Sequence, residues 1–74
     1  MQVTEATKRF SHKKLKSLRE QHGLSVTQMA AHLGVVENTY RSMERGRAMP
    51  RVNHVLIMLE LFELRPTDLS QLLE

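Results

Sequence analysis

The stretch from Gly23 to Gly46 constrains the fold of this 74-residue chain more than any other part. It reads GLSVTQMAAHLGVVENTYRSMERG, with a glycine at each end and a third, Gly34, inside. Ser25 and Gln28 have the spacing of a capping box, in which each side chain bonds to the backbone of the other residue. Glycine often ends a helix by adopting a left-handed backbone conformation. The stretch therefore predicts two short helices joined by a tight turn at Gly34.

The rest of the chain also shows helical spacing and no alternating strand pattern, so the sequence predicts an all-α fold. Ser11 is a favoured N-cap for the first helix, Pro50 precedes the fourth, and Pro66 is a favoured first residue for the fifth. We expect one compact domain of five helices over residues 11–74, preceded by a flexible N-terminal arm of residues 1–10.

Apolar residues at helical spacing predict which face of each helix is buried. The helix after Pro50 is the most apolar, and we expect it to lie at the centre of the core. The residues expected to point inward from the first three helices are Leu15, Leu18, Met29, Ala30, Leu33, Tyr40 and Met43. In the fourth helix the residues at helical spacing are Val52, Val55, Leu56, Leu59 and Phe62, and further apolar surface comes from Ile57, Met58 and Leu61.

The formal net charge of +3 is unevenly distributed along the chain. Residues 1–51 contain ten Lys or Arg and four Asp or Glu, a net charge of +6. Residues 52–74 contain one Arg and four Asp or Glu, a net charge of −3. Such a distribution favours a protein that presents one face to a polyanion such as nucleic acid. The alternative is a solvated surface on which the lysines happen to be uneven.

No metal site, cofactor or catalytic site is predicted. The chain has no cysteine, and its four histidines lack the spacing that places two ligands on one helical face. There is no glycine-rich phosphate loop and no second catalytic group beside a serine or histidine, so we do not expect an enzyme. No apolar run is long enough to span a bilayer, and the N-terminus lacks the apolar core of a secretory signal. We therefore expect a cytoplasmic protein.

Several short motifs, taken in order, resemble the helix-turn-helix family of phage lambda-type repressors and Cro proteins, the XRE type. The motifs are Leu15, Leu18 and Arg19, then Gly23-Leu24-Ser25, Ala30, Leu33-Gly34-Val35, Glu44-Arg45-Gly46, and Pro50. The match covers roughly residues 15–73, with the helix-turn-helix proper at about residues 25–45. The resemblance implies a five-helix lambda-repressor-like DNA-binding domain from a prokaryote or a phage.

The resemblance also pairs Arg19, late in the first helix, with Glu44 at the end of the third. A charge-assisted hydrogen bond between them would fix the angle of the third helix, whereas the alternative is two independent surface charges. The chain departs from the family pattern at three positions. Val26 replaces the glutamine that clamps a phosphate, and Val36 replaces a Ser or Thr cap. Glu63 replaces a glycine that is common after the fourth helix, so we expect Glu63 to adopt an unfavourable backbone conformation.

The second helix of such a motif can enter the major groove of DNA, where polar side chains at its start and outer edge read bases. By position, the base-contact candidates are Val36, Glu37, Asn38, Arg41 and Ser42. Asn38 suits adenine, and Arg41 suits either guanine or a phosphate. Glu37 and Arg41 can instead form a plain surface pair at i, i+4 spacing. The phosphate-contact candidates are Ser25, Thr27, Gln28, Thr39, Arg45 and Arg47.

These features favour a sequence-specific transcriptional regulator whose partner is double-stranded DNA. A module this small makes few base contacts, so we expect a homodimer on a near-palindromic operator, and the resemblance implies a repressor. Leu69, Leu72 and Leu73 are the dimer candidates; the alternative is that they fold back onto the fourth helix. The alternative function is a protein-interaction module of the antitoxin or antirepressor type, in which the same fold binds a protein partner.

Overall fold

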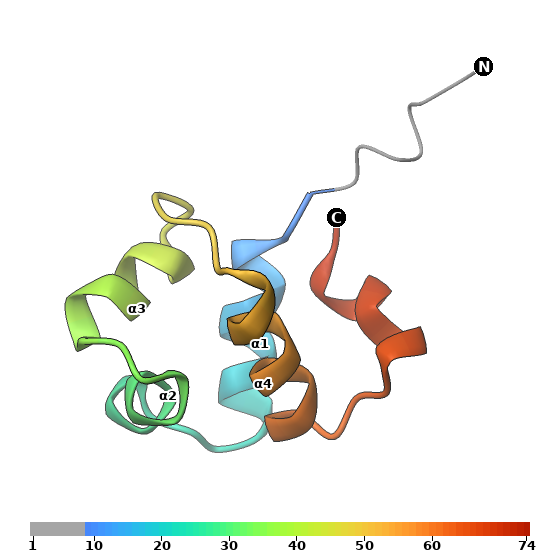
Figure 1. Cartoon of the computed structure of the whole chain (residues 1–74), viewed down its shortest axis with the longest axis horizontal. Helices are drawn as coiled ribbons and strands as arrows, with labels where there is room; N and C mark the ends of the chain where they lie inside the picture. Colours follow the sequence, from blue (N-terminus) through green and yellow to red (C-terminus); the bar gives the residue numbers. More distant parts are fainter. Residues whose placement is uncertain (1–8) are drawn as a thin grey trace.

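The computed structural model describes residues 9–74, which form five helices around one core (Figure 1). In chain order the helices are α1 (His12–Gln21), α2 (Val26–Leu33), α3 (Glu37–Glu44), α4 (Val52–Leu61) and the 3₁₀ helix η2 (Pro66–Leu72). The described residues contain no strand, and an antiparallel β-bridge joins Phe10 to Leu73. The predicted all-α fold is confirmed, with a 3₁₀ rather than an α-helix as its last element.

The helix ends follow signals that can be read locally in the sequence. Ser11 caps α1, because its hydroxyl oxygen accepts a hydrogen bond from the backbone N–H of Lys14 at 3.1 Å. The predicted capping box starts α2: Ser25 N–H donates to Gln28 Oε1 at 2.8 Å, and Gln28 N–H donates to Ser25 Oγ at 3.0 Å. Gly34 ends α2 with a φ angle of 72°, which a residue with a Cβ rarely adopts. This turn sets α3 against α2.

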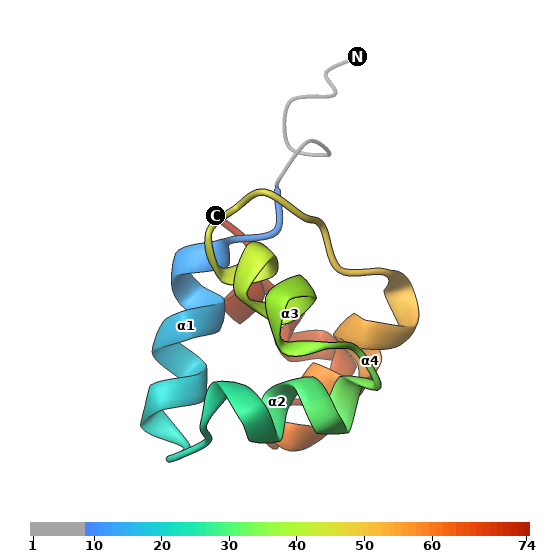
Figure 2. The same cartoon turned by 90° about the vertical axis from the view of Figure 1, so that its left-hand side faces the viewer.

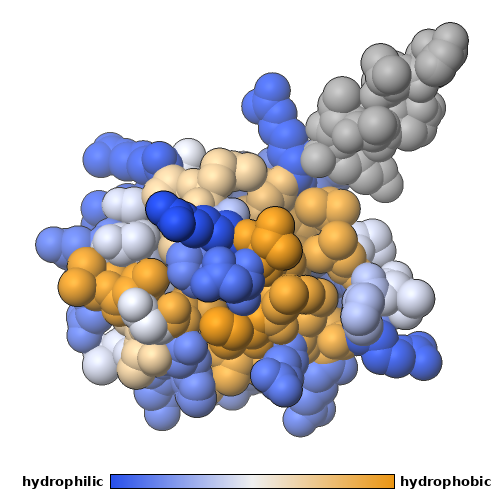
Figure 3. Space-filling view, viewed as in Figure 1, coloured by the Kyte–Doolittle hydropathy of each residue, from blue (hydrophilic) through white to orange (hydrophobic). Residues whose placement is uncertain are grey.

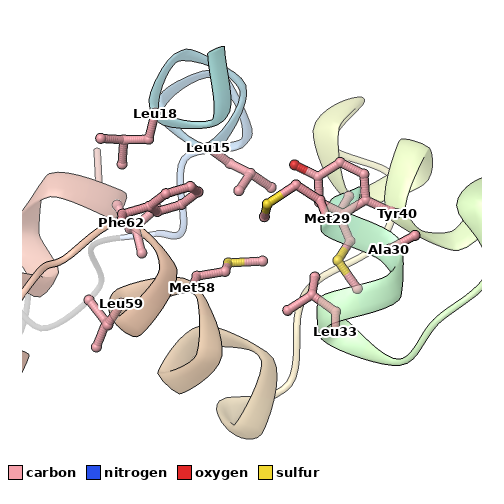
Figure 4. Close-up of a cluster of buried hydrophobic side chains, with 11 residues drawn as sticks. Leu15, Leu18, Met29, Ala30, Leu33, Tyr40, Met58, Leu59 and Phe62 are labelled. Carbon is pink, nitrogen blue, oxygen red and sulfur yellow. The ribbon is translucent and has the colours of Figure 1, made fainter. Parts of the chain in front are cut away.

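The core lies where side chains from the helices converge (Figure 4). Leu15 of α1, Met29 of α2 and Tyr40 of α3 meet Met58 from α4 and Phe62, which follows α4, and all five are almost fully buried. The remaining buried hydrophobic residues are Leu18, Ala30, Leu33, Met43, Leu59 and Leu72. The predicted inward faces of the first three helices are therefore confirmed.

The predicted inward face of α4 is partly wrong. Val52 and Leu56, which were expected in the core, are 77% and 57% exposed, whereas Met58 is fully buried. Seven of the ten residues of α4 are apolar and they cover more than one side of the helix, so their spacing did not single out its inner face. Packing of α4 against α2 and η2 makes that choice.

The two ends of the described chain lie side by side. Ser11 N–H donates to the carbonyl of Leu72 at 2.7 Å, and Glu74 N–H donates to the carbonyl of Arg9 at 2.9 Å. Phe10 also packs against the core. Residues 9 and 10 of the predicted flexible arm are thus held by the C-terminal residues, while residues 1–8 of that arm lie outside the described residues.

Candidate nucleic-acid interface

Helix α3 has a buried side and an exposed side. Tyr40 and Met43 point into the core and anchor it. Figure 2 shows α2 and α3 as neighbouring helices on the face turned toward the viewer, with α1 beside them. The exposed side of α3 carries Asn38, Thr39 and Arg41. This arrangement leaves the polar edge of α3 free to meet a large partner.

The five base-contact candidates gather at the start and along the outer part of α3. Val36 is 69% exposed and, as the sequence predicted, provides no side-chain cap for α3. Asn38 and Arg41 are exposed, whereas Glu37 and Ser42 are half-buried. All five therefore keep accessible surface on or directly before one helix, which is the geometry that base reading in the major groove requires.

Glu37 links α2 to α3. The hydroxyl of Thr27 in α2 donates to Glu37 Oε2 at 2.7 Å, and Arg41 Nη2 lies 3.4 Å from Glu37 Oε1. The i, i+4 pair that the sequence left as an alternative is thus present, between side chains that are more than 40% exposed. The link to Thr27 has no signal in the sequence, because it depends on the angle at which α2 and α3 meet. It engages the only hydroxyl proton that Thr27 can donate.

Arg19 and Glu44 are in direct contact in the interior of the motif. Arg19 Nε donates to Glu44 Oε2 at 2.6 Å and Nη2 donates to Oε1 at 3.3 Å, while Nη1 donates to the carbonyl of Leu24 at 2.9 Å. Tyr40 also donates its hydroxyl proton to Glu44. The Arg19 and Glu44 side chains are only 12% and 10% exposed. This network ties α3 to α1 and to the loop before α2.

Burial and hydrogen bonding alter the proton affinity of two groups in this network. Burial is the main cause that raises the pKa of the Tyr40 hydroxyl, and its hydrogen bond to Glu44 adds to the effect. The hydrogen bond to Glu44 raises the pKa of the Arg19 guanidinium, against the opposing effect of burial. Both shifts keep the network in one charge state, with a neutral phenol and a charged guanidinium.

The six phosphate-contact candidates are all exposed: Ser25, Thr27, Gln28, Thr39, Arg45 and Arg47. Some of their polar atoms already have partners. Ser25 and Gln28 bond to each other's backbone in the capping box, and Thr27 donates to Glu37. The charged candidates Arg45 and Arg47 carry no side-chain hydrogen bond to another described residue.

A basic cavity of about 280 Å³ lies between α1, the start of α2 and the end of α3. It is lined by Lys16, Arg19, Val26, Arg41, Glu44 and Arg45. The sequence pattern allows Lys16 to face water or a phosphate, but Lys16 was not among the phosphate-contact candidates, because helical periodicity shows only that it faces away from the core. The three-residue spacing from Lys16 to the buried Arg19 is the one signal that could have pointed to it.

A family model described as a helix-turn-helix domain matches residues 13–72, which include all of α2, α3 and α4. The chain belongs to the helix-turn-helix family. The predicted resemblance to lambda-type repressors and Cro proteins is confirmed by solved structures. The restriction-modification controller protein C.AhdI from Aeromonas hydrophila aligns with a TM-score of 0.67 and 24% identity over 78% of this chain and 88% of that chain. An HTH_3 family transcriptional regulator from Vibrio cholerae aligns with a TM-score of 0.65 and 25% identity over 81% of this chain and 34% of that chain.

Two curated relatives carry names that describe them as HTH-type transcriptional regulatory proteins. The one from Pyrococcus horikoshii is 35% identical over 63 residues, which make up 81% of this chain and 20% of the relative. The one from Pyrococcus abyssi is 36% identical over 55 residues, or 74% of this chain and 17% of the relative. This helix-turn-helix chain therefore spans about a fifth of the length of these relatives.

The helix-turn-helix domain has an apolar groove of about 340 Å³ between α4 and η2. It is lined by Phe10, Pro50, Val52, Val55, Leu56, Leu59, Pro66, Leu69 and Leu73. Figure 3 shows hydrophobic residues gathered on this face of the molecule. Of the three dimer candidates, Leu69 is 36% exposed and Leu73 is half-buried, but Leu72 is fully buried. Leu72 is thus a core residue without exposed surface for a dimer contact. For this residue the structure agrees with the alternative, in which it folds back onto the fourth helix.

Within residues 9–74, no group of three or more His, Cys, Asp or Glu residues is placed to hold a metal ion. None of the described helices combines the length and the apolar character that crossing a membrane requires.

Proposed function

We propose that this helix-turn-helix domain binds double-stranded DNA and regulates transcription, with α3 in the major groove. The observation that carries the proposal is the exposed polar edge of α3, which is held at a fixed angle by the buried Arg19–Glu44 pair. Asn38 lies near the start of α3, where residues of a recognition helix meet base edges. Arg45 and Arg47 follow α3 and supply positive charge for the DNA backbone.

We further propose that the regulator is a repressor, acting in the cytoplasm of a prokaryotic cell as a homodimer on a near-palindromic operator. One module presents a single recognition helix, so two copies are needed for specific binding at two half-sites one helical turn apart. The apolar groove supports dimerisation, because a second copy of the chain could cover its exposed residues Val52, Leu56 and Leu69. The mechanism is occupation of the promoter and involves no catalytic step.

Selection of bound sites from random duplex DNA tests the proposal. We expect a recovered motif with two inverted halves about ten base pairs apart, and binding that weakens steeply as salt rises. Asn38→Ala should relax the preference at one position of each half-site, whereas Thr39→Ala on the same exposed side should weaken binding to all sequences alike. Recovery of no motif, together with affinity that does not respond to salt, would refute DNA binding.

The alternative of a protein-interaction module is supported by the same apolar groove, because a surface of this kind often marks a protein contact. The substitution pair Val52→Ser and Leu56→Ser tests whether the groove is the dimer contact or is left for another protein. If the groove is the dimer contact, the double variant should become monomeric in analytical ultracentrifugation and lose affinity for the two-half operator while keeping its weak affinity for one half-site. A double variant that stays dimeric and keeps its affinity for the two-half operator would contradict the proposal that the groove is the dimer contact.

A further inference from the structure

The structure offers a replacement for a DNA contact that this chain lacks. In the family that the chain resembles, a glutamine at the first position of α2 clamps a phosphate, and here that residue is Val26. We propose that Lys16, Arg41 and Arg45 form an anion site around Val26 that binds one phosphodiester group of DNA. This inference rests on the proposed function, and it assigns the missing contact to side chains from α1 and α3 instead of α2.

The cavity beside Val26 provides the space for such a group. It has a volume of about 280 Å³ and is bounded by α1, the start of α2 and the end of α3. Arg19 and Glu44 form part of its wall, but they are bonded to each other and are almost buried. Their charges largely cancel, so the accessible cations Lys16, Arg41 and Arg45 set the potential inside the cavity.

Two of these cations are free to receive an anion. Among residues 9–74, neither Lys16 nor Arg45 has a carboxylate oxygen within 4.0 Å of its side-chain nitrogens. Arg41 is shared, because its Nη2 lies 3.4 Å from Glu37 Oε1. A phosphate must therefore compete with Glu37 for Arg41, and the pair is exposed enough for that exchange to cost little.

The first turn of α2 has backbone donors close to the cavity, because Val26, its first residue, lines that cavity. In an eight-residue helix that begins at Val26, the N–H groups of the first residues have no partner within the helix. The capping box occupies the N–H groups of Ser25 and Gln28, which leaves those of Val26 and Thr27 for an outside acceptor. Amide donors at the start of α2 thus lie next to a cavity that is lined by Lys16 from α1 and by Arg41 and Arg45 from α3 and its C-terminal end.

The site changes the expected role of Arg41. A guanidinium engaged with a phosphate positions the protein on DNA and reads no base. Base reading is then left to Asn38 and Ser42 on the outer edge of α3. Glu37 limits how tightly Arg41 binds the DNA phosphate, because its carboxylate pairs with the same guanidinium. The proposal therefore assigns Arg41 and Arg45 to the DNA backbone and leaves base contacts to other residues of the same exposed side of α3.

Binding measurements on the operator recovered by selection test the site. We expect Arg41→Gln and Lys16→Gln each to weaken binding about tenfold on every sequence, to leave base preference unchanged, and to reduce the salt slope by about one. Arg65→Gln is the matched control, since it removes the same charge from a side chain that is 83% exposed and lies outside the cavity. Thermal denaturation of each variant shows that the fold is retained.

A scan of single neutral methylphosphonates along the operator locates the bound phosphate. At one position per half-site, the methylphosphonate should weaken DNA binding by the wild type but have little effect on binding by Arg41→Gln or Lys16→Gln. The variant Glu37→Gln should bind all duplexes more tightly than the wild type does. If no position loses its effect in these variants, or if Arg41→Gln alters base preference instead, the anion site is refuted. A wild type that binds no duplex would refute the proposed function itself.

A titration of the free protein with inorganic phosphate at constant ionic strength separates DNA from a free anion. We expect at most a weak shift of the amide resonance of Val26, because a single free phosphate lacks the neighbouring contacts that hold DNA in place. A saturable shift, together with a methylphosphonate scan in which no position loses its effect in Arg41→Gln or Lys16→Gln, would overturn the assignment to DNA and identify free phosphate as the ligand.

Discussion

Replacing Glu44 by glutamine tests the buried network that holds α3 in place. The substitution keeps the size of the side chain but removes the charge that Arg19 faces at 2.6 Å. Arg19 would remain 12% exposed, with the carbonyl of Leu24 as its main partner. Tyr40 would lose a charged acceptor for its hydroxyl proton. The fold is thus left with a buried cation that no anion compensates.

Removing one member of a buried pair costs about 3–5 kcal/mol, because the remaining charge is left without compensation. Both side chains keep about a tenth of their surface exposed, so we expect the lower end, about 3 kcal/mol. A domain of this size has roughly 3–10 kcal/mol of total stability. The variant should therefore melt about 12–24 °C below the wild type, or be partly unfolded at room temperature.

Urea denaturation followed by far-UV circular dichroism measures this loss. Glu20→Ala is the control, since Glu20 Oε2 lies 4.0 Å from Arg19 Nη2 but its side chain is 59% exposed, and we expect a change below about 0.5 kcal/mol. The pair Arg19→Met and Glu44→Leu should cost much less together than the two changes do separately. The reasoning would be refuted if the losses in the free energy of unfolding for Arg19→Met and Glu44→Leu were additive, or if Glu44→Gln lost less than about 1 kcal/mol. Either result would show that the pair contributes no more than an exposed ion pair does.

Three further changes have defined outcomes. Gly46→Ala should cost about 1–2 kcal/mol in urea denaturation, because Gly46 has a φ angle of +77° and an added Cβ would lie 2.8 Å from His12 Nδ1. Glu63→Gly should raise stability by about 0.5–1 kcal/mol, because Glu63 has a φ angle of 57° in the left-handed region that glycine adopts freely. Tyr40, the chain's single tyrosine, should not ionise near pH 10 in the folded protein, because its pKa is raised. The raised pKa contributes stability below the unfolded pKa of about 10, and this contribution is lost as pH rises above it.

Each of these outcomes has a control. In a His12→Ala background, Gly46→Ala should lower the free energy of unfolding only by the cost of its positive φ angle. An unchanged loss would show that the clash with His12 does not contribute. Glu60→Gly, inside α4, should lower stability by about 1 kcal/mol, so a stabilised Glu60 variant would contradict the argument from backbone conformation. Phenolate absorbance that rises near pH 10, before the circular dichroism changes, would refute the shift of Tyr40.

The position of Glu63 illustrates how a departure from a family pattern can predict backbone strain. The sequence has glutamate where related chains have glycine, and the structure gives that residue a positive φ angle. The prediction succeeded because the end of α4 is a local feature, fixed by the helix and the turn that follows it. The residues of the candidate base-reading edge were likewise found by position along one helix, although their contacts with DNA stay predictions.

The sequence by itself determined the features that depend on neighbours a few residues away. Ser11, Ser25 and Gln28 start helices, and Gly34 ends one, because caps and turns form between residues close in the chain. The inward faces of α1, α2 and α3 also followed from spacing, since each has a distinct polar side that excludes the alternatives. These local signals agree with one another, which is why the fold class was predictable.

Only the tertiary structure decided the features that depend on how helices meet. Which side of α4 is buried, and therefore whether Leu56 is exposed, was undetermined because its seven apolar residues cover more than one side of the helix. The bond from Thr27 to Glu37 depends on the angle between α2 and α3, and the cavity lined by both Lys16 and Arg45 depends on how α1 packs beside α3, so no local pattern encodes them. The burial of Leu72 likewise follows from the packing of η2 on α1 and α4. Interactions between residues close in sequence determine the helices of this protein, and the packing of those helices determines which side chains share a site.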